Sequence, residues 1–202
     1  CVRCRRRLDI TEVVCPHDGH RTLEIASKTD PRISKTIEGQ FTILGLLGSG
    51  GAGSVYRALQ HSMEREVAVK LLRRECVLDS EAIQRFLHEA RSASQLSHPN
   101  IITLFDFGQT AKGELFLVME LLRGRPLRQL LDEEGTLSPS RVVSIGSQIC
   151  DALIVAHEQG VVHRDLKPEN VFVMGGVQGR GEFVKLLDFG IAKSISTATS
   201  MG

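Results

Sequence analysis

Apolar residues between about residues 41 and 122 occur in short runs that polar or charged positions interrupt. The clearest of these runs are residues 41–44, 66–70 and 115–119. Their length and their β-branched and aromatic content are typical of strands. One segment in this region repeats its apolar residues at helical spacing instead, and Asp79 or Ser80 can cap that helix. The repeated positions are Ile83, Phe86, Leu87 and Ala90. The pattern therefore predicts a sheet with one helix inserted between its strands.

The pattern changes after Arg123 and Gly124, where helical periodicity prevails. We predict a long helix over residues 140–159 that ends at Gly160. Its apolar positions are Val142, Ile145, Ile149 and Leu153. Composition and pattern together divide the chain into residues 1–25, 26–40, 41–122 and 123–202, of which the second part is a polar linker. A strand-rich part followed by a helix-rich part predicts the α+β class.

Composition sets limits on the function. The chain has 202 residues, of which 42% are hydrophobic and 24% are charged, and these values are ordinary for a globular protein. A net charge of +1 argues against a general nucleic-acid-binding protein. The apolar runs are too short to span a bilayer, so we expect no membrane segment in this chain. Five cysteines, an odd number, favour a reducing cytoplasm over a disulfide framework.

A glycine-rich segment follows the first predicted strand, with glycines at positions 48, 50, 51 and 53. Without a Cβ, such a backbone turns sharply and brings its amide groups close to phosphate oxygens. Glycines at this spacing also occur in tight hairpins and in dinucleotide-binding folds. A dinucleotide site expects a helix directly after the glycines, whereas residues 54–58 continue as a strand. This context favours a hairpin that covers a triphosphate.

A second chemical signal lies at residues 163–170, with the sequence His-Arg-Asp-Leu-Lys-Pro-Glu-Asn. Five positions separate Asp165 from Asn170, which suits one loop that presents both side chains to the same substrates. Asp188, Phe189 and Gly190 follow downstream. Hard cations such as Mg²⁺ prefer oxygen ligands of the kind that these side chains carry. The order of these groups indicates phosphoryl transfer.

Together with Lys70 in the segment Val-Ala-Val-Lys, these motifs resemble those of a protein kinase of the bacterial serine/threonine type. Their amino-acid sequence is similar to that of myxobacterial kinases. The resemblance implies a bilobal fold with an antiparallel N-lobe sheet, a helix αC and a mainly helical C-lobe. It implies transfer of the γ-phosphoryl group of ATP, with Mg²⁺, to Ser or Thr hydroxyls of protein substrates.

The resemblance also implies roles for individual residues. Asp165 accepts or orients the proton of the substrate hydroxyl, and Lys167 neutralises charge on the transferring phosphoryl group. Asn170 and Asp188 hold Mg²⁺. Lys70 contacts the nucleotide phosphates and takes Glu89 of the predicted helix as its partner. His163 and Phe189 have structural roles.

By the same resemblance, Glu120 and Leu122 are the hinge positions whose backbone binds adenine, and Met119 precedes them as gatekeeper. Val55, Ala68 and Phe172 form apolar walls of the base pocket, although core packing explains these three equally well. The complete set of nucleotide-binding positions is Leu47, Gly48, Ser49, Gly50, Gly51, Ala52, Gly53, Val55, Ala68, Lys70, Glu89, Met119, Glu120, Leu122 and Phe172.

The N-terminal cysteines indicate a separate zinc-binding element. Cys1 and Cys4 form one knuckle, and Cys15 with Asp18 resembles a second knuckle in which aspartate replaces a cysteine. The fourth Zn²⁺ ligand stays open among Asp18, His17 and His20. A disordered basic leader is the alternative, because four arginines lie between residues 3 and 7.

The resemblance covers residues 41–202 and stops inside the activation segment, before an Ala-Pro-Glu element and the later helices. We therefore expect the chain by itself to be inactive toward protein substrates. A noncatalytic ATP-binding or scaffolding module is the alternative function. Arg164 beside Asp165 indicates regulation by phosphate on the activation segment, with Thr197 and Thr199 as the favoured acceptors.

Overall fold

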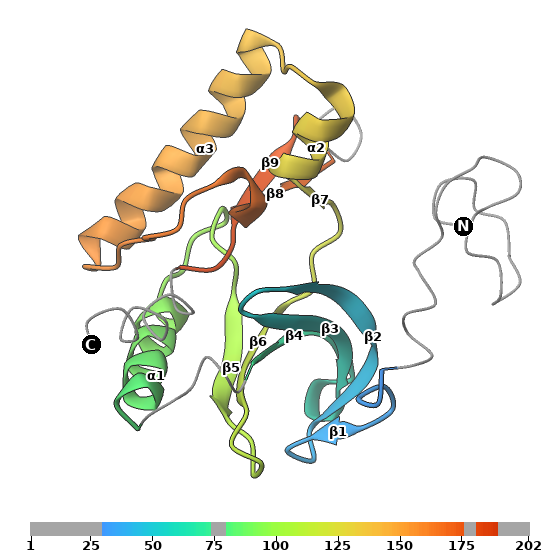
Figure 1. The fold of residues 1–202 in the computed structure, drawn as a ribbon. Coiled ribbons are helices and arrows are strands. Elements are labelled where there is room, and N and C mark those ends of the chain that lie inside the picture. Colours follow the sequence, from blue (N-terminus) through green and yellow to red (C-terminus); the bar gives the residue numbers. More distant parts are fainter. Residues whose placement is uncertain (1–29, 74–79, 176–180, 190–202) are drawn as a thin grey trace, which may run out of the picture.

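The structure, a computed structural model, describes residues 30–73, 80–175 and 181–189. Two parts are visible in Figure 1, a larger antiparallel sheet with one helix beside it and a smaller part that contains two helices and a short sheet. The sequence predicts this division into a strand-rich and a helix-rich part, and the structure confirms it.

The larger sheet has six strands in the order β1-β2-β3-β4-β6-β5, and every neighbouring pair is antiparallel. Its strands are β1 (Thr36–Ile37), β2 (Phe41–Gly50), β3 (Gly53–Gln60), β4 (Arg65–Leu72), β5 (Leu104–Gln109) and β6 (Leu115–Glu120). The three runs predicted as strands lie within β2, β4 and β6, so this prediction is confirmed. Strand β1 and the pairing of β5 with β6 carry no comparable apolar signal in the sequence.

Both faces of the central strand β4 are covered, and residues 67–72 are all buried. Val69 and Leu71 belong to an outer apolar cluster with Phe41, Ile43 and Tyr56. The alternate positions on β4 face the opposite side, where the main core and α1 lie. Because successive side chains of a strand point to opposite faces, β4 links the outer cluster to the interior of the molecule.

The helix α1 (Ser80–Ser94) packs against the inner side of this sheet, beside β5 in Figure 1. Its fully buried residues are Ala82, Phe86, Ala90 and Ala93. Of the predicted apolar face, Phe86 and Ala90 are buried, whereas Ile83 and Leu87 are half-buried at its edges. The small alanines at the contact let the helix approach the sheet closely.

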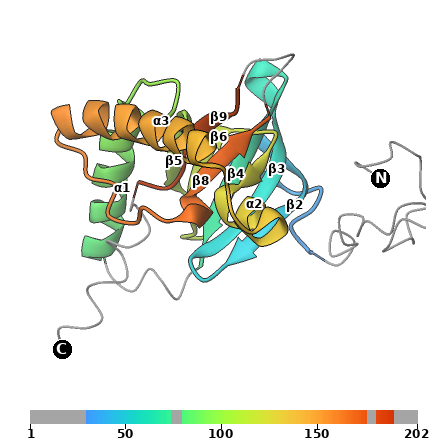
Figure 2. The same cartoon turned by 90° about the horizontal axis from the view of Figure 1, so that it is seen from above.

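The second part combines helices with a three-stranded sheet of order β7-β8-β9. Its elements are β7 (Arg125–Pro126), α2 (Leu127–Glu134), α3 (Pro139–Glu158), the 3-10 turn η4 (Pro168–Asn170), β8 (Val171–Met174) and β9 (Phe183–Leu186). Figure 2 shows α3 crossing over this sheet, where it contacts β9. The chain passes from β6 to β7 through Gly124, where an added Cβ would lie 2.3 Å from the carbonyl oxygen of Val173 in β8.

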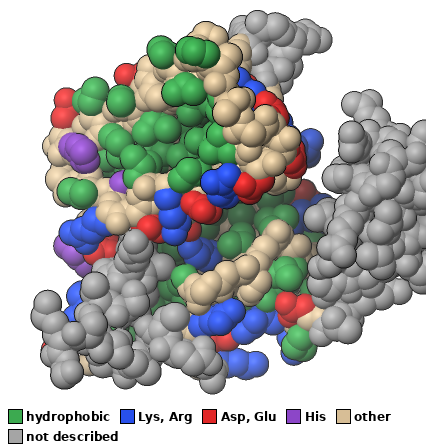
Figure 3. Space-filling model, turned by 45° about the horizontal axis from the view of Figure 1, so that its top comes forward, with side chains coloured by type: hydrophobic (Ala, Val, Ile, Leu, Met, Phe, Trp, Pro, Cys, Tyr) green, Lys and Arg blue, Asp and Glu red, His purple; other side chains and the backbone are tan. Residues whose placement is uncertain are grey.

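The bounds of α3 confirm the predicted long helix, but its predicted apolar face is partly wrong. Ile145 is buried, and Ile149 and Leu153 pack half-buried against the core. Val142 is 53% exposed, and Val143 and Ile154 are also exposed. Figure 3 shows apolar side chains gathered on this upper face of the molecule. None of the helices in the described ranges combines the length and the apolar character that a membrane span requires.

The two parts are joined by a hydrogen-bonded connection around Asn100, which is buried in the segment between α1 and β5. Its side-chain amide donates to the Val184 carbonyl in β9 and to Gln148 in α3, at 2.7 and 3.0 Å. The backbone amide of Leu186 donates to the Asn100 carbonyl, and that of Ile102 donates to the Leu186 carbonyl. Strand β9 is therefore held against the larger part just before Asp188.

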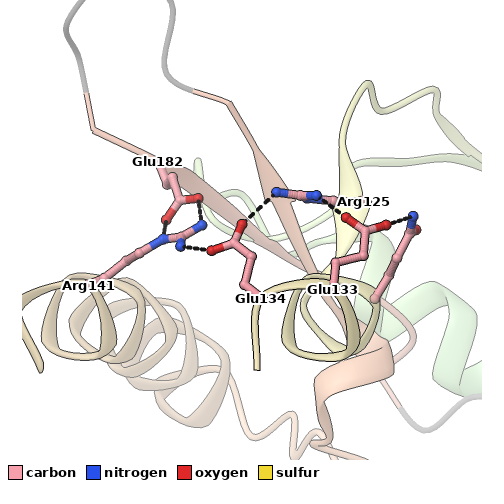
Figure 4. A network of polar contacts seen from close by, with 6 residues as sticks. Arg125, Glu133, Glu134, Arg141 and Glu182 are labelled. Carbon is pink, nitrogen blue, oxygen red and sulfur yellow. Dashed lines mark hydrogen bonds and ion pairs between the residues drawn. The ribbon is translucent and has the colours of Figure 1, made fainter. Parts of the chain in front are cut away.

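A network of ion pairs closes the outer end of the second part (Figure 4). Arg141 of α3 binds Glu182, which precedes β9, through two nitrogens at 2.5 and 2.6 Å, and it also binds Glu134 at the end of α2. Arg125 of β7 binds Glu134 at 2.9 Å and Glu133. The two carboxylates bound to Arg141 raise the pKa of its guanidinium above the ordinary value. The network connects both helices to both edges of the small sheet.

Candidate active site

The glycine-rich segment forms the hairpin between β2 and β3, with Gly50 paired to Gly53. A Cβ at Gly53 would lie 2.1 Å from the carbonyl oxygen of Leu71, so the hairpin rests directly on the backbone of β4. The amide of Arg73 donates to the carbonyl of Ala52 and ties the tip to the end of β4. A strand follows the glycines, as the sequence predicts, and a dinucleotide-binding fold with a helix at this point is excluded.

Lys70 stands opposite Val55 in the β3–β4 ladder, under this hairpin. Its side chain is 10% exposed, and its Nζ donates to Oδ2 of Asp188 at 2.6 Å. Asp188 follows β9, so this ion pair joins the sheet to the second part. A buried ammonium beside a half-exposed carboxylate places opposite charges at the bottom of the space below the glycine hairpin.

The expected pair between Lys70 and Glu89 is not the one that the structure shows. Oε1 of Glu89 accepts a hydrogen bond from the guanidinium of Arg164 at 2.7 Å. The acidic partner of Lys70 comes instead from Asp188. Sequence motifs identify the charged groups but not their pairing, because the pairing depends on the tertiary fold. Arg164 adopts a left-handed backbone conformation with φ 57° at this point.

The segment from Asp165 to Asn170 folds into one compact loop that ends in η4. The side-chain amide of Asn170 donates to the carbonyl and to Oδ2 of Asp165, at 2.8 and 3.0 Å. Nζ of Lys167 lies 3.0 Å from the same carboxylate oxygen. The structure thus brings together the three side chains that the sequence assigns to one loop. The Asp165 carboxylate is 17% exposed and fixed by two donors.

His163 supports this loop from the interior and is 2% exposed. Its Nε2 lies 2.8 Å from the Leu187 carbonyl, which only accepts, so Nε2 carries the proton. The amide of Asp165 points to Nδ1 at 3.4 Å, which completes the pattern of a neutral ring. Burial lowers the pKa of His163 below the ordinary value. The centroid of its ring lies 4.7 Å from the ring centroid of Phe189, and Phe189 is itself buried.

The oxygens available for Mg²⁺ come from Asn170 and Asp188. The Asn170 side-chain nitrogen is used inside the loop, which leaves its amide oxygen as a potential ligand. The Leu187 amide donates to the Asn170 carbonyl at 2.8 Å and so holds the adjacent Asp188 next to the loop. A carboxylate and an amide oxygen suit a hard cation that keeps several waters. The described part of the chain contains no cluster of three His, Cys, Asp or Glu side chains, so these two oxygens are a sparse donor set.

Apolar residues line the space between the hairpin and the hinge. Ala68 of β4 pairs with Met119 of β6, and both are buried in the main core, while Val55 and Leu122 pack half-buried against it. Leu47 is 46% exposed at the base of the hairpin. Met119 and Phe189 also meet at a small cavity of about 10 Å³ under α1. The residues expected at the base pocket therefore belong to the main core or pack against it. Phe172, the last of the expected wall residues, is half-buried on β8.

The sequence interpretation missed a hydrogen-bonded connection at the hinge. Nζ of Lys185 in β9 donates to Oε1 of Glu120 at 2.5 Å and to the Ile101 carbonyl at 3.1 Å. The same Glu120 oxygen accepts from the amide of Thr103 at 2.7 Å. A lysine in the apolar strand β9 is the only signal that could have pointed to this contact. The connection fixes the side chain of the residue whose backbone is expected to bind adenine.

Several predicted positions lie outside the described residues. They are the expected zinc ligands Cys1, Cys4, Cys15 and Asp18, the expected phosphate acceptors Thr197 and Thr199, and Gly190 and Cys76. The zinc and phosphorylation sites therefore stay predictions. Cys150 lies exposed on α3 as a free cysteine.

Comparison with known proteins agrees with this geometry. Residues 41–201 match the family described as protein kinase domain. The chain is 46% identical over 174 residues to the serine/threonine-protein kinase pkn3 of Myxococcus xanthus, which covers 86% of this chain and 31% of that protein. It is 40% identical over 169 residues to PrkC of Bacillus subtilis, covering 83% of this chain and 25% of PrkC. The chain spans less than a third of either relative.

Among solved structures, the PknI kinase domain of Mycobacterium tuberculosis superimposes with a TM-score of 0.71 at 30% identity. The match covers 78% of this chain and 62% of that domain. The agreement in fold extends over both parts of the described chain.

Proposed function

Because the chain belongs to the protein kinase domain family, we propose that it transfers the γ-phosphoryl group of ATP to Ser or Thr hydroxyls of protein substrates. The printed names of its relatives in Myxococcus and Bacillus support the serine/threonine class. The observation that carries the proposal is the Asp165 carboxylate, held at 3.0 Å by both Lys167 and Asn170 in one loop.

Each charged residue has a task in this reaction. Asp165 receives the hydrogen bond of the substrate hydroxyl and orients its oxygen toward the phosphorus. Lys167, whose side chain is 46% exposed, reaches the transferring group while it remains bonded to Asp165. Lys70 binds phosphate oxygens from the sheet side. Catalysis of this kind depends mainly on positioning and on charge stabilisation, so fixed side chains are its main requirement.

Asn170 and Asp188 would hold Mg²⁺, which supplies charge neutralisation at the phosphates when it is bound. In the structure Asp188 binds Lys70 directly. Phosphate oxygens compete with Asp188 for the Lys70 ammonium, and Glu89 becomes its second acidic partner once Arg164 releases it. Nucleotide binding would therefore break two ion pairs of this structure, the one between Lys70 and Asp188 and the one between Glu89 and Arg164.

The alternative is a noncatalytic module that binds ATP. It would retain Lys70 and the glycine hairpin without a need for the Asp165 loop. The intact hydrogen bonds from Asn170 and Lys167 to Asp165 favour the enzyme.

The test measures ³²P transfer from labelled ATP to a mixture of basic proteins, with the chain extended through a complete kinase C-lobe because the chain by itself is expected to be inactive toward proteins. Asp165→Asn is compared with Asp151→Asn, an exposed aspartate on α3. We expect Asp165→Asn to reduce transfer by roughly two orders of magnitude or more and to leave Mg-ATP binding intact. The control variant should behave like the natural protein. Binding of Mg-ATP with no transfer by the extended protein would identify the noncatalytic module instead.

A further inference from the structure

One cavity in the described part of the chain lies away from the candidate active site. It has a volume of about 570 Å³ and opens on the outer face of the six-stranded sheet, at the lower end in Figure 1. Residues 31–38 form one wall, and the turn between β5 and β6 forms the other. Its floor is made by Ile43 and Leu71 of the outer cluster. Lys70 points to the opposite face of the same strand.

One wall of this cavity precedes the kinase domain. The family match begins at residue 41, whereas six of the lining residues lie between Pro31 and Glu38. The glycine hairpin and the catalytic loop contribute no lining residue. The cavity is therefore an addition to the domain and not a part of its nucleotide site.

Hydrogen bonds hold the two walls in place. The hydroxyl of Tyr56 donates to Asp30 at 2.7 Å, and Arg32 donates to the same hydroxyl at 3.2 Å. Arg32 also binds Glu114, at the far end of the β5–β6 turn, at 2.9 Å. The amide of Ala111 donates to Glu38 at 2.9 Å across the opening. A cavity whose walls are already fixed loses little conformational entropy when a ligand binds.

The lining is apolar at the floor and cationic at the rim. Ile37 joins Ile43 and Leu71 at the floor, while Arg32, Lys35 and Lys112 surround the opening. Both acidic groups of the lining have partners, since Glu114 binds Arg32 and Glu38 binds a backbone amide. The volume is that of a typical site for a small organic ligand. We propose that this cavity binds a small amphipathic anion, with its apolar body on the floor and its acidic head at the cationic rim.

Strand β4 connects this site to the nucleotide hairpin. The side chain of Leu71 forms part of the floor, while its carbonyl oxygen is the atom on which Gly53 rests. The adjacent Lys70 carries the ion pair with Asp188. A ligand that shifts Leu71 would therefore displace the base of the glycine hairpin. Binding itself does not depend on the proposed kinase activity, and the two are tested separately.

The probe is anilinonaphthalene sulfonate, an apolar anion that fluoresces when it leaves water. Titration of the purified chain should give saturable binding at one site, without displacement by Mg-ATP. The neutral analogue N-phenylnaphthylamine lacks the sulfonate and should bind at least about fivefold more weakly, because it brings no negative charge to the cationic rim. The emission of Tyr56, the one tyrosine in a chain without tryptophan, should change on binding.

Variants locate the site. The double variant Lys35→Glu/Lys112→Glu should weaken binding by roughly tenfold, since two rim charges change sign. Arg91→Glu alters an exposed cation on α1, outside the lining, and should leave binding unchanged. Ala111→Phe fills the opening from an exposed turn and should abolish binding while the melting temperature stays the same. Unchanged affinity in both cavity variants, displacement by Mg-ATP, or equal affinity for the neutral analogue would each overturn the proposal.

Discussion

The ammonium of Lys70 lies 2.6 Å from the carboxylate of Asp188, although 118 positions separate the two residues. Lys70 comes from β4, a largely buried strand of the larger sheet, and Asp188 comes from the segment after β9. The hydrogen bonds of Asn100, Gln148 and Leu186 bring these elements together. The ion pair between Lys70 and Asp188 is therefore a direct contact between the two parts of the molecule.

Lys70→Met should remove the cation that both Asp188 and a nucleotide phosphate use. We expect Mg-ATP to raise the melting temperature of the natural chain and to have little effect on this variant. In a protein extended through a complete C-lobe, phosphate transfer should fall by orders of magnitude. Lys112→Met, which removes an exposed lysine on the β5–β6 turn, is the control and should retain the response to nucleotide. An undiminished nucleotide response in Lys70→Met would contradict the role of Lys70.

Gly53→Ala should destabilise the protein, because the new methyl group would lie 2.1 Å from the Leu71 carbonyl oxygen. Relief of that overlap requires movement of the backbone, at a cost of about 2 kcal/mol or more. Gly51→Ala is a matched control two positions away, where no atom lies within 4 Å of the added carbon. Urea denaturation of both variants measures the difference. Equal midpoints would show that the hairpin does not rest on β4.

Stability should decrease as the pH falls through the range in which His163 titrates. Burial lowers its pKa in the folded state, so the unfolded chain binds more protons below about pH 6.5. The stabilisation that neutral His163 provides is present above the pKa of this residue in the unfolded chain. It is lost as the pH falls toward the pKa of His163 in the folded protein. We expect the melting temperature of the natural protein to drop more between about pH 7.5 and 5.5 than that of His163→Phe. Parallel pH profiles for the two proteins would refute this.

Arg141→Ala should destabilise the second part by about 1 kcal/mol, because Glu134 and Glu182 both lose a partner. Arg128→Ala removes an exposed arginine that binds Asp132 one helical turn away, and its effect should be clearly smaller. Chemical denaturation compares the two. The Arg141 variant should also be more sensitive to proteolysis near Glu182, at the start of β9, than the control.

Mutation of Cys4 and Cys15 tests the zinc element predicted from the sequence. The purified natural chain should contain one Zn²⁺ per molecule under reducing conditions, measured by mass spectrometry of the metal content. Cys4→Ser/Cys15→Ser should lower that content to the background level. Cys150→Ser, which replaces an exposed cysteine on α3, serves as the control and should leave the metal unchanged. An absence of zinc in the natural chain would show that the knuckle interpretation is wrong.

The sequence predicts those features that depend on short spacings. The loop from Asp165 to Asn170, the strand after the glycines and the long helix α3 each follow from a local pattern. Pairing between distant charges does not follow in this way. Glu89 binds Arg164 because the tertiary fold brings these two side chains within 2.7 Å, and no local pattern records that distance.

The same limit explains the contacts that sequence reasoning missed. Lys185 binds Glu120 across the hinge, and Arg32 binds Tyr56 and Glu114 beside the outer cavity. Lys185, Arg32 and Glu114 look like ordinary surface charges in the sequence. Only the packing of the sheet reveals that they connect elements far apart in the chain. The predicted apolar face of α3 is partly wrong for a related reason, since helical periodicity does not show which apolar positions a neighbouring element covers, and Val142 is exposed whereas Ile145 is buried.

Gly124 determines how closely the chain before β7 can approach β8. A Cβ at this position would lie 2.3 Å from the Val173 oxygen and 3.0 Å from the Phe172 ring. Because Arg125 pairs with Val173 and Pro126 pairs with Phe172, a larger residue at position 124 would force β7 away from β8. It would also displace Phe172, which is expected from the sequence at the base pocket. The absence of one side chain at the hinge is therefore a condition for the position of another side chain on the neighbouring strand.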